Sequence, residues 1–183
     1  MNYGAIKYCD IANGVGVRTS LFVSGCRVHC PGCFNEEAQS FTFGKPFTRE
    51  VADEIIESLR PSYVRGLSLL GGDPMEPEHQ EELLALCELV IRELPEKDIW
   101  CYTGYVYDRD LVPGGKRYLE NVTDELLDCI DVLVDGPFVA TEEDITLRFR
   151  GSSNQRLIDL VKTRESGEIV PWVDEKVYST HSM

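Results

Sequence analysis

The sequence has no long hydrophobic run and little positive charge. No segment approaches the roughly 18 consecutive apolar residues of a membrane-spanning helix, which argues against a membrane partner. Residues 1–10 show neither the basic start nor the apolar stretch of a secretion signal, so we expect a cytoplasmic protein. Only 18 Lys and Arg face 32 Asp and Glu, giving a net charge of −14. Because phosphate binding needs a basic surface, we expect no nucleic-acid partner.

Histidine is also scarce, at three residues, whereas cysteine is abundant, at seven. An odd number of cysteines in a chain of 183 residues argues against a framework of disulfide bonds. Cys26, Cys30 and Cys33 share one loop with the spacing C-x3-C-x2-C. The other four lie in apolar segments, where free thiols behave as small hydrophobic side chains, so we expect them in the core. These four are Cys9, Cys87, Cys101 and Cys129.

Apolar runs alternate with amphipathic segments along the chain. This pattern indicates an α/β fold of mainly parallel strands joined by right-handed crossovers. The length predicts a single domain over residues 1–183, with a core of about 2–163 and a tail of about 164–183 that has little periodicity. We expect strands at 17–23, 67–70, 99–103, 131–135 and 156–161, helices at 49–60, 77–94 and from 123 onward, and a surface loop at 111–121.

A conspicuous group follows each of the first four predicted strands. The cysteine loop follows the first, and Gly71-Gly72-Asp73-Pro74 follows the second. Thr103-Gly104 ends the third strand and Asp135-Gly136-Pro137 ends the fourth. The carboxyl ends of parallel strands lie on one side of an α/β fold, and binding sites form there. We therefore expect these groups to meet in one site.

The three cysteines of the loop suit a metal centre with soft ligands. Thiolates select zinc, copper(I) or iron–sulfur clusters. Zinc in a structural site takes four ligands, and His29 would have to be the fourth, although its position next to Cys30 strains a tetrahedral site. A four-iron cluster would instead keep one iron open, free to bind a substrate or cofactor. An electron carrier with a plain cluster is a further alternative.

The cysteine spacing after a strand, with Phe34 following the last cysteine, resembles the radical S-adenosylmethionine superfamily. The resemblance implies a partial (β/α) barrel of mainly parallel strands. It also implies a 4Fe-4S cluster held by the three loop cysteines, whose open iron chelates S-adenosylmethionine. Gly71, Gly72 and Asp73 resemble the superfamily's turn that receives the methionine amino group. Asp73 stands where many members have glutamate, so backbone carbonyls would supply part of that contact.

Four stretches are similar, more narrowly, to the activating enzymes of anaerobic (class III) ribonucleoside-triphosphate reductases. They are residues 13–35, 67–74, 102–105 and 131–156, and the last contains Arg-Gly-Ser-Ser-Asn-Gln-Arg. The resemblance implies an oxidoreductase that cleaves S-adenosylmethionine reductively and generates a glycyl radical on the reductase. A flavodoxin or ferredoxin is the implied electron donor, and the reductase is the implied protein partner.

The same resemblance implies roles for individual residues. Gly32 and Phe34 flank Cys33 and would line the adenine or cluster side. Thr103 and Asp135 would contact the ligand or a bound cation, and ordinary capping at a strand end explains them equally well. The basic run of Arg148, Arg150 and Arg156 is either a docking patch for the reductase or a set of partners for neighbouring acidic helices.

Two other classes of function remain open from the sequence. One is a radical S-adenosylmethionine enzyme that acts on another glycyl-radical enzyme or on a small molecule, as a deazaguanine synthase does. The other is a protein without catalytic activity, either a zinc-binding interaction module or the electron carrier. Bound metal distinguishes the zinc module from the rest, and product formation separates the enzymes from the carrier.

Overall fold

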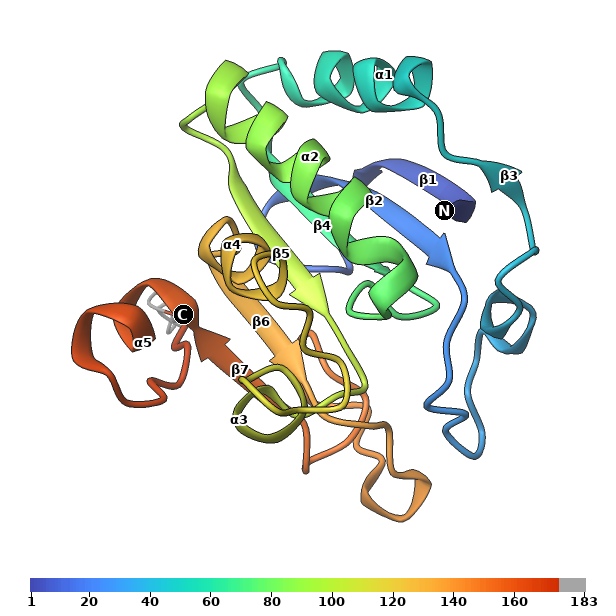
Figure 1. Cartoon of the computed structure of the whole chain (residues 1–183), viewed down its shortest axis with the longest axis vertical. Coiled ribbons are helices and arrows are strands. Elements are labelled where there is room, and N and C mark those ends of the chain that lie inside the picture. The colour runs from blue at the N-terminus through green and yellow to red at the C-terminus, as the bar shows by residue number, and fades with distance from the viewer. Residues whose placement is uncertain (175–183) are drawn as a thin grey trace, which may run out of the picture.

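One seven-stranded sheet organises the chain, whose computed structural model describes residues 1–174 (Figure 1). The strands are ordered β3-β1-β2-β4-β5-β6-β7 across the sheet. The mixed α/β class is confirmed, with a parallel centre as predicted. The strands are β1 (Asn2–Asp10), β2 (Val17–Ser24), β3 (Lys45–Pro46), β4 (Val64–Gly71), β5 (Asp98–Tyr102), β6 (Val132–Asp135) and β7 (Arg156–Asp159).

The parallel centre places four strand ends on one side of the molecule. Strands β2, β4, β5 and β6 run in the same direction, and their arrows in Figure 1 point toward the cysteine loop. The outer strands differ from the prediction, because β1, β3 and β7 pair antiparallel with their neighbours. The connection 11–16 between β1 and β2 is far too short for a parallel crossover, so this pair forms a hairpin.

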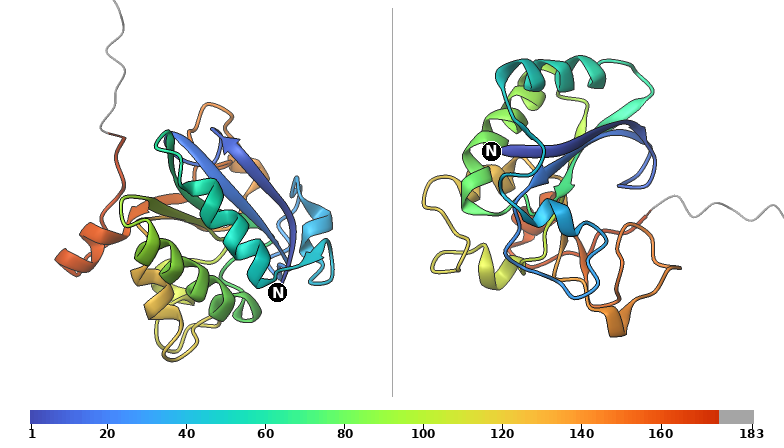
Figure 2. Two further views of the ribbon diagram at one scale, coloured as in Figure 1. Left: turned by 90° about the horizontal axis from the view of Figure 1, so that it is seen from above. Right: turned by 90° about the vertical axis from the view of Figure 1, so that its right-hand side faces the viewer.

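Helices α1 (Arg49–Leu59), α2 (Pro77–Glu93) and α4 (Thr123–Asp128) lie along one face of the sheet (Figure 2). The periodicity of α1 predicted a helix with one buried side, because the buried positions Ile55, Ile56 and Leu59 recur at helical spacing. Thr48 occupies the N-cap position of α1, but its side chain makes no capping hydrogen bond. The remaining helices are α3 (Tyr107–Asp110) and α5 (Leu160–Ser166), with 3-10 turns η1 (Glu36–Gln39) and η2 (Ala140–Glu142).

A buried arginine and three aromatic rings occupy the other face. The Arg18 guanidinium is fully buried, donates from Nε to Ser68 Oγ at 2.6 Å, and lies 5.4 Å from the Trp100 ring. Trp100 packs edge-on against Phe149 and Trp172, at ring-centroid distances of 5.2 and 5.0 Å. Through these contacts, the segments that contain Phe149 and Trp172 pack against the sheet. No helix within residues 1–174 is long and apolar enough to cross a bilayer.

Residues 156–174 contain more regular structure than the sequence predicts. Strand β7 ends at Asp159, whose side chain accepts from Lys162 N at 3.0 Å and begins α5, so residues 160 and 161 are helical. After α5 the chain returns to the sheet, where Trp172 N donates to Leu157 O at 2.8 Å. The predicted tail thus contains a helix end and a bridge to β7, and its residues 175–183 lie outside the described part.

The four cysteines predicted for the core divide into two kinds. Cys87 and Cys101 are fully buried, as expected, and burial raises their thiol pKa well above the usual value. Cys129 is half-buried, and its pKa is raised to about 11 by the same desolvation. The prediction is wrong for Cys9, which is exposed at a positive φ of 54° in the irregular end of β1.

This division predicts the order in which the scattered thiols react. Alkylation of the native apoprotein with iodoacetamide should modify Cys9 first, because a thiol reacts as an accessible thiolate. Cys87 and Cys101 should react only after denaturant is added. Peptide mass spectrometry over a time course measures each site, and early labelling of Cys101 would contradict the buried position of β5.

Candidate functional site

The cysteine loop leaves the sheet through a crowded glycine. Gly25 follows β2 with a φ of +117°, and a Cβ there would lie only 2.3 Å from the Phe41 ring. Its N–H donates to Ala38 O at 2.7 Å, and the N–H of Cys26 donates to Gln39 O at 3.1 Å. The 3-10 turn η1 therefore fixes the direction in which the chain enters the loop.

The turn after β4 lies directly against this loop. Gly72 N donates to Val23 O at 2.7 Å, and Asp73 N donates to Gly25 O at 2.8 Å. A Cβ on Gly72 would lie 2.5 Å from Gly25 O, so only glycine permits the two backbones to approach this closely. The second glycine of the sequence pattern is thus explained by contact with the cysteine loop.

The carboxylate of Asp73 joins the ends of β4 and β5. Its Oδ1 accepts from Thr103 Oγ1 at 2.8 Å and from Met75 N at 2.9 Å, and its Oδ2 accepts from Gly104 N at 2.8 Å. Burial raises the pKa of Asp73 to about 7, although these hydrogen bonds lower it. The hydroxyl of Thr103, which was predicted to contact a ligand, thus donates its hydrogen bond to Asp73 instead.

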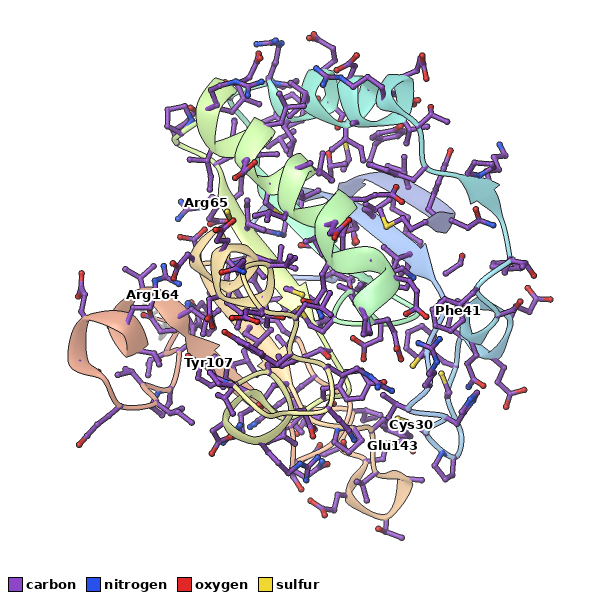
Figure 3. All side chains as sticks on the ribbon, viewed as in Figure 1. Cys30, Phe41, Arg65, Tyr107, Glu143 and Arg164 are labelled. Carbon is purple, nitrogen blue, oxygen red and sulfur yellow. The ribbon has the colours of Figure 1, made fainter. Side chains whose placement is uncertain are left out.

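A cavity of about 490 Å³ lies at the carboxyl ends of the parallel strands. It brings together most of the residues predicted from the sequence, and in Figure 3 Cys30 and Glu143 mark the cysteine loop and the C-terminal wall. Predicted residues lining the cavity are Cys26, Cys30, Gly32, Cys33, Phe34, Gly71, Gly72, Asp73 and Thr103. Residues added by the structure include Ala12, Asn13, Tyr102, Phe138, Phe149, Arg150 and Gln155.

Two predicted residues have positions that differ from the others. Phe34 is 92% exposed at the rim of the cavity. Asp135 does not line the cavity, since its buried carboxylate accepts from Arg156 Nε at 2.9 Å and from Tyr107 N at 2.8 Å. Capping at the end of β6, the alternative considered for Asp135, describes what its side chain does here.

The basic run is largely engaged within the protein. Arg156 pairs with Asp135 and with Asp108, and Arg148 pairs with Asp174. These contacts favour internal pairing over a docking patch for both residues. Arg150 differs, because it lines the cavity and donates to the backbone carbonyl of Gln155.

Two of the loop thiols, Cys26 and Cys30, are in surroundings that disfavour negative charge. Desolvation, followed by the nearby carboxyl of Asp73, raises the pKa of Cys26 to about 12. Desolvation also raises the pKa of Cys30. Thiolate ligands here therefore need a positive centre to compensate them, which irons provide.

The described residues contain no ready-made site for a single metal ion. Within residues 1–174, no three Cys, His, Asp or Glu side chains converge as ligands of one metal ion. A four-iron cluster does not require three side chains to converge on one ion, because each thiolate binds a different iron. The imidazole of His29, the ligand required by the zinc alternative, contacts Gln39 Oε1 at 2.7 Å.

Sequence reasoning missed a buried carboxylate that holds the cysteine loop. Glu76, at the N-cap of α2, is fully buried and accepts from the backbone N and the guanidinium of Arg27, both at 2.7 Å. It also accepts from Tyr105 OH at 2.5 Å and lies 3.4 Å from Arg117 Nε. No sequence signal separates Glu76 from an ordinary acidic residue at a helix start.

The packing of β4 against β2 predicts a strong effect of a small substitution. Gly71 has a φ of +112°, and a Cβ there would lie 2.6 Å from Val23 O. Gly71→Ala should lower the free energy of unfolding by about 2–4 kcal/mol, because strain and overlap add. Gly167→Ala is the matched control, with a φ of +73° and no atom within 4 Å, and should cost about 1 kcal/mol. Equal losses in urea unfolding would contradict the close approach.

A comparison with known protein families first identifies the class of protein to which the chain belongs. A family described as "4Fe-4S single cluster domain" matches residues 12–158, a span that contains the cysteine loop and every strand end of the site. The chain is therefore an iron–sulfur protein of the single-cluster 4Fe-4S class.

Individual relatives identify a narrower family within this class. Anaerobic ribonucleoside-triphosphate reductase-activating proteins of Salmonella typhimurium and Escherichia coli K12 are 43% and 42% identical, over 85% of this chain and 96% of theirs. The protein of that name from bacteriophage T4 is 40% identical over 86% of this chain and 93% of its own. The chain belongs to the family of anaerobic ribonucleoside-triphosphate reductase-activating proteins.

Proposed function

We propose that this protein activates an anaerobic ribonucleoside-triphosphate reductase by generating a glycyl radical on it. The observation that carries the proposal is the shared cavity, which is lined both by the three loop cysteines and by the turn Gly71-Gly72-Asp73. The relatives that match over most of the chain bear the name of this activity. Family membership makes the reductase the proposed partner, and a flavodoxin or ferredoxin is the proposed electron donor.

The proposed cofactors are a 4Fe-4S cluster and S-adenosylmethionine. Cys26, Cys30 and Cys33 would each bind one iron, which leaves the fourth iron without a protein ligand. The cluster and S-adenosylmethionine, when bound, supply one-electron cleavage of the sulfonium and removal of a hydrogen atom from a glycine of the reductase. The residues of the chain bind and orient these groups and keep water from them.

The turn after β4 would receive the methionine end of S-adenosylmethionine. The Asp73 carboxylate already accepts from Thr103 and Gly104, so we assign to it the positioning of the turn. Backbone groups of Gly71 and Gly72, which line the cavity, would then make the direct contacts. Gly32 lines the same cavity, and Phe34 at its rim is placed to meet an arriving reductase segment.

The fold supports this assignment at a coarser level. A parallel sheet centre with one functional edge is compatible with the partial (β/α) barrel of the radical S-adenosylmethionine superfamily. We propose that geometry for the strands β2, β4, β5 and β6, within one domain. The antiparallel strands β1, β3 and β7 are additions to it.

Anaerobic reconstitution tests the proposal. The wild-type protein should take up about four irons per chain and form 5′-deoxyadenosine when reduced with S-adenosylmethionine present. A glycyl radical signal should appear by electron paramagnetic resonance only when the reductase is added. Bound zinc without iron would overturn the proposal, as would product formation from a small molecule that needs no reductase.

A further inference from the structure

Two arginines from distant segments meet beside the cysteine loop. Arg27 directly follows Cys26, and Arg117 comes from residues 111–121, the segment that was predicted to be a surface loop. Arg27 Nη1 lies 2.7 Å and Arg117 Nε lies 3.4 Å from the same carboxylate oxygen, Oε2 of the buried Glu76. The predicted surface loop is thus attached to the segment that carries the cysteines.

Two more cations extend this group along the surface. Lys116 Nζ and Arg117 Cζ lie over the ring of Tyr105, at 5.0 and 4.7 Å from its centroid. Lys116 Nζ also lies 3.7 Å from Asp110 Oδ1, and Arg109 Nη2 lies 2.8 Å from Asp110 Oδ2. We define the cationic patch as Arg27, Arg109, Lys116 and Arg117.

The cationic patch presents more positive than negative charge to the solvent, in a chain whose net charge is −14. Three of its four side chains are between 43% and 64% exposed. Of the carboxylates that pair with it, Glu76 is fully buried and Asp110 is only 4% exposed. Glu78, at 49%, is the exposed carboxylate among these partners. An approaching protein would therefore meet mostly cations here.

The cationic patch is separate from the cavity, although the cysteine loop contributes to both. None of the four patch residues lines the cavity, whose wall includes Cys26 and the exposed Glu143. Exposed charges close to the cavity in sequence are acidic, since Glu36 and Glu37 follow the cysteine loop and Glu142 precedes Glu143. The patch is therefore available to a partner that does not enter the cavity.

We propose that the cationic patch docks the protein that reduces the cluster, and that this partner is an electron carrier with an acidic surface. The assignment rests on the proposed function. The carrier must come close to the cluster, and the position of Arg27 next to Cys26 places the patch at the cysteine loop. The transfer balances as one electron lost by the reduced carrier and one gained by the oxidised cluster, with no bond made or broken.

The size and charge of the cationic patch suit such a partner. Complementary charge speeds the encounter of two proteins more than it adds to their affinity. Contacts between electron-transfer proteins are small and short-lived, with less than about 1,200 Å² buried. A patch of four cations around one aromatic ring therefore suffices to orient a carrier that arrives, delivers an electron and leaves.

Charge reversal at Lys116 tests the assignment, because this exposed residue does not line the cavity. Reduced flavodoxin and reduced ferredoxin are each mixed at low salt with the anaerobically reconstituted wild type and Lys116→Glu, and the loss of visible absorbance of the cluster gives the rate. The carrier that is faster with the wild type should reduce Lys116→Glu about five- to tenfold more slowly. In about 0.5 M salt the two rates should converge, because screening removes the attraction.

Two further variants and a small reductant separate docking from damage to the site. Lys116→Arg keeps the charge and should retain the wild-type rate. Lys45→Glu, the matched reversal of an exposed lysine on β3, should retain it too. Photoreduced deazariboflavin, a small uncharged reductant that needs no docking, should reduce the wild type and all three variants at equal rates. Their iron contents should also be equal.

The outcomes distinguish the docking patch from the proposed function. Equal rates of wild type and Lys116→Glu with the faster carrier would overturn the inference alone, and so would a difference that persists in high salt or that appears with deazariboflavin. Failure of both carriers to reduce the wild-type cluster would overturn it too. A wild type that assembles no four-iron cluster, or forms no 5′-deoxyadenosine with deazariboflavin as reductant, would overturn the proposed function itself.

Discussion

Cys30→Ala is expected to abolish both iron loading and glycyl-radical formation. Each thiolate would hold a separate iron, and alanine offers no donor, so only two protein ligands would remain. Iron should fall from about four per chain to near zero after reconstitution. The fold should persist, because Cys30 lies half-buried in a loop outside the sheet. Iron and sulfide analysis, with circular dichroism for folding, measures the two effects separately.

The chain provides a matched control for this experiment. Cys9→Ala removes an exposed thiol outside the cavity and should leave iron content and radical yield at wild-type values. Cys26→Ala and Cys33→Ala should behave as Cys30→Ala does. Full iron loading by any of the three loop variants would show that the cluster has another ligand.

Glu76→Ala is expected to be the most destabilising change outside the sheet. The substitution leaves the Arg27 N–H and the Tyr105 hydroxyl without their acceptor, and it removes the partner of two guanidinium groups. Breaking a buried ion pair commonly costs about 3–5 kcal/mol. Arg27 is 43% exposed, so water screens part of the loss, and we expect about 2–4 kcal/mol. For this size of chain the melting temperature should fall by roughly 5–15 °C.

The effect of Glu76→Ala should also appear in the amount of iron that the cysteine loop binds. Arg27 directly follows Cys26, so loosening the Glu76 contact should slow cluster assembly and lower iron content. Glu76→Gln keeps an acceptor for Tyr105 and should lose about half as much stability. Glu78→Gln is the control, because Glu78 pairs with the same arginine from a half-exposed position. Comparable losses for Glu78→Gln and Glu76→Ala would contradict a specific role for the buried carboxylate.

The central strands and long helices were predictable because their burial is regular. Parallel strands are covered on both faces and appear as continuous apolar runs, which identified β4, β5 and β6. The outer strand β1 mixes half-buried and exposed residues, and β3 has only two residues, so neither carries a recognisable pattern. β7 was predicted too long because Leu160 and Val161 are apolar, while the capping contact of Asp159 begins a helix there.

The candidate site was predictable where chemistry resides in short motifs. The cysteine spacing and the glycine pair are local features, and the structure places both on one cavity. Asp135 appeared equivalent to them as a residue at a strand end, but Arg156 from the antiparallel neighbour takes up its carboxylate. Only the pairing of β6 with β7 brings those two side chains together.

The sequence by itself determined the cysteine loop, the tight turn that follows β4 and the α/β class, since each depends on spacing or on the period of apolar residues. The tertiary structure alone decided which polar groups are paired. Glu76 is engaged by Arg27 and Tyr105, whereas the buried Tyr102 hydroxyl has no hydrogen-bond partner among residues 1–174. The physical reason is that hydrogen bonds between distant segments depend on strand order and packing, which no local pattern encodes.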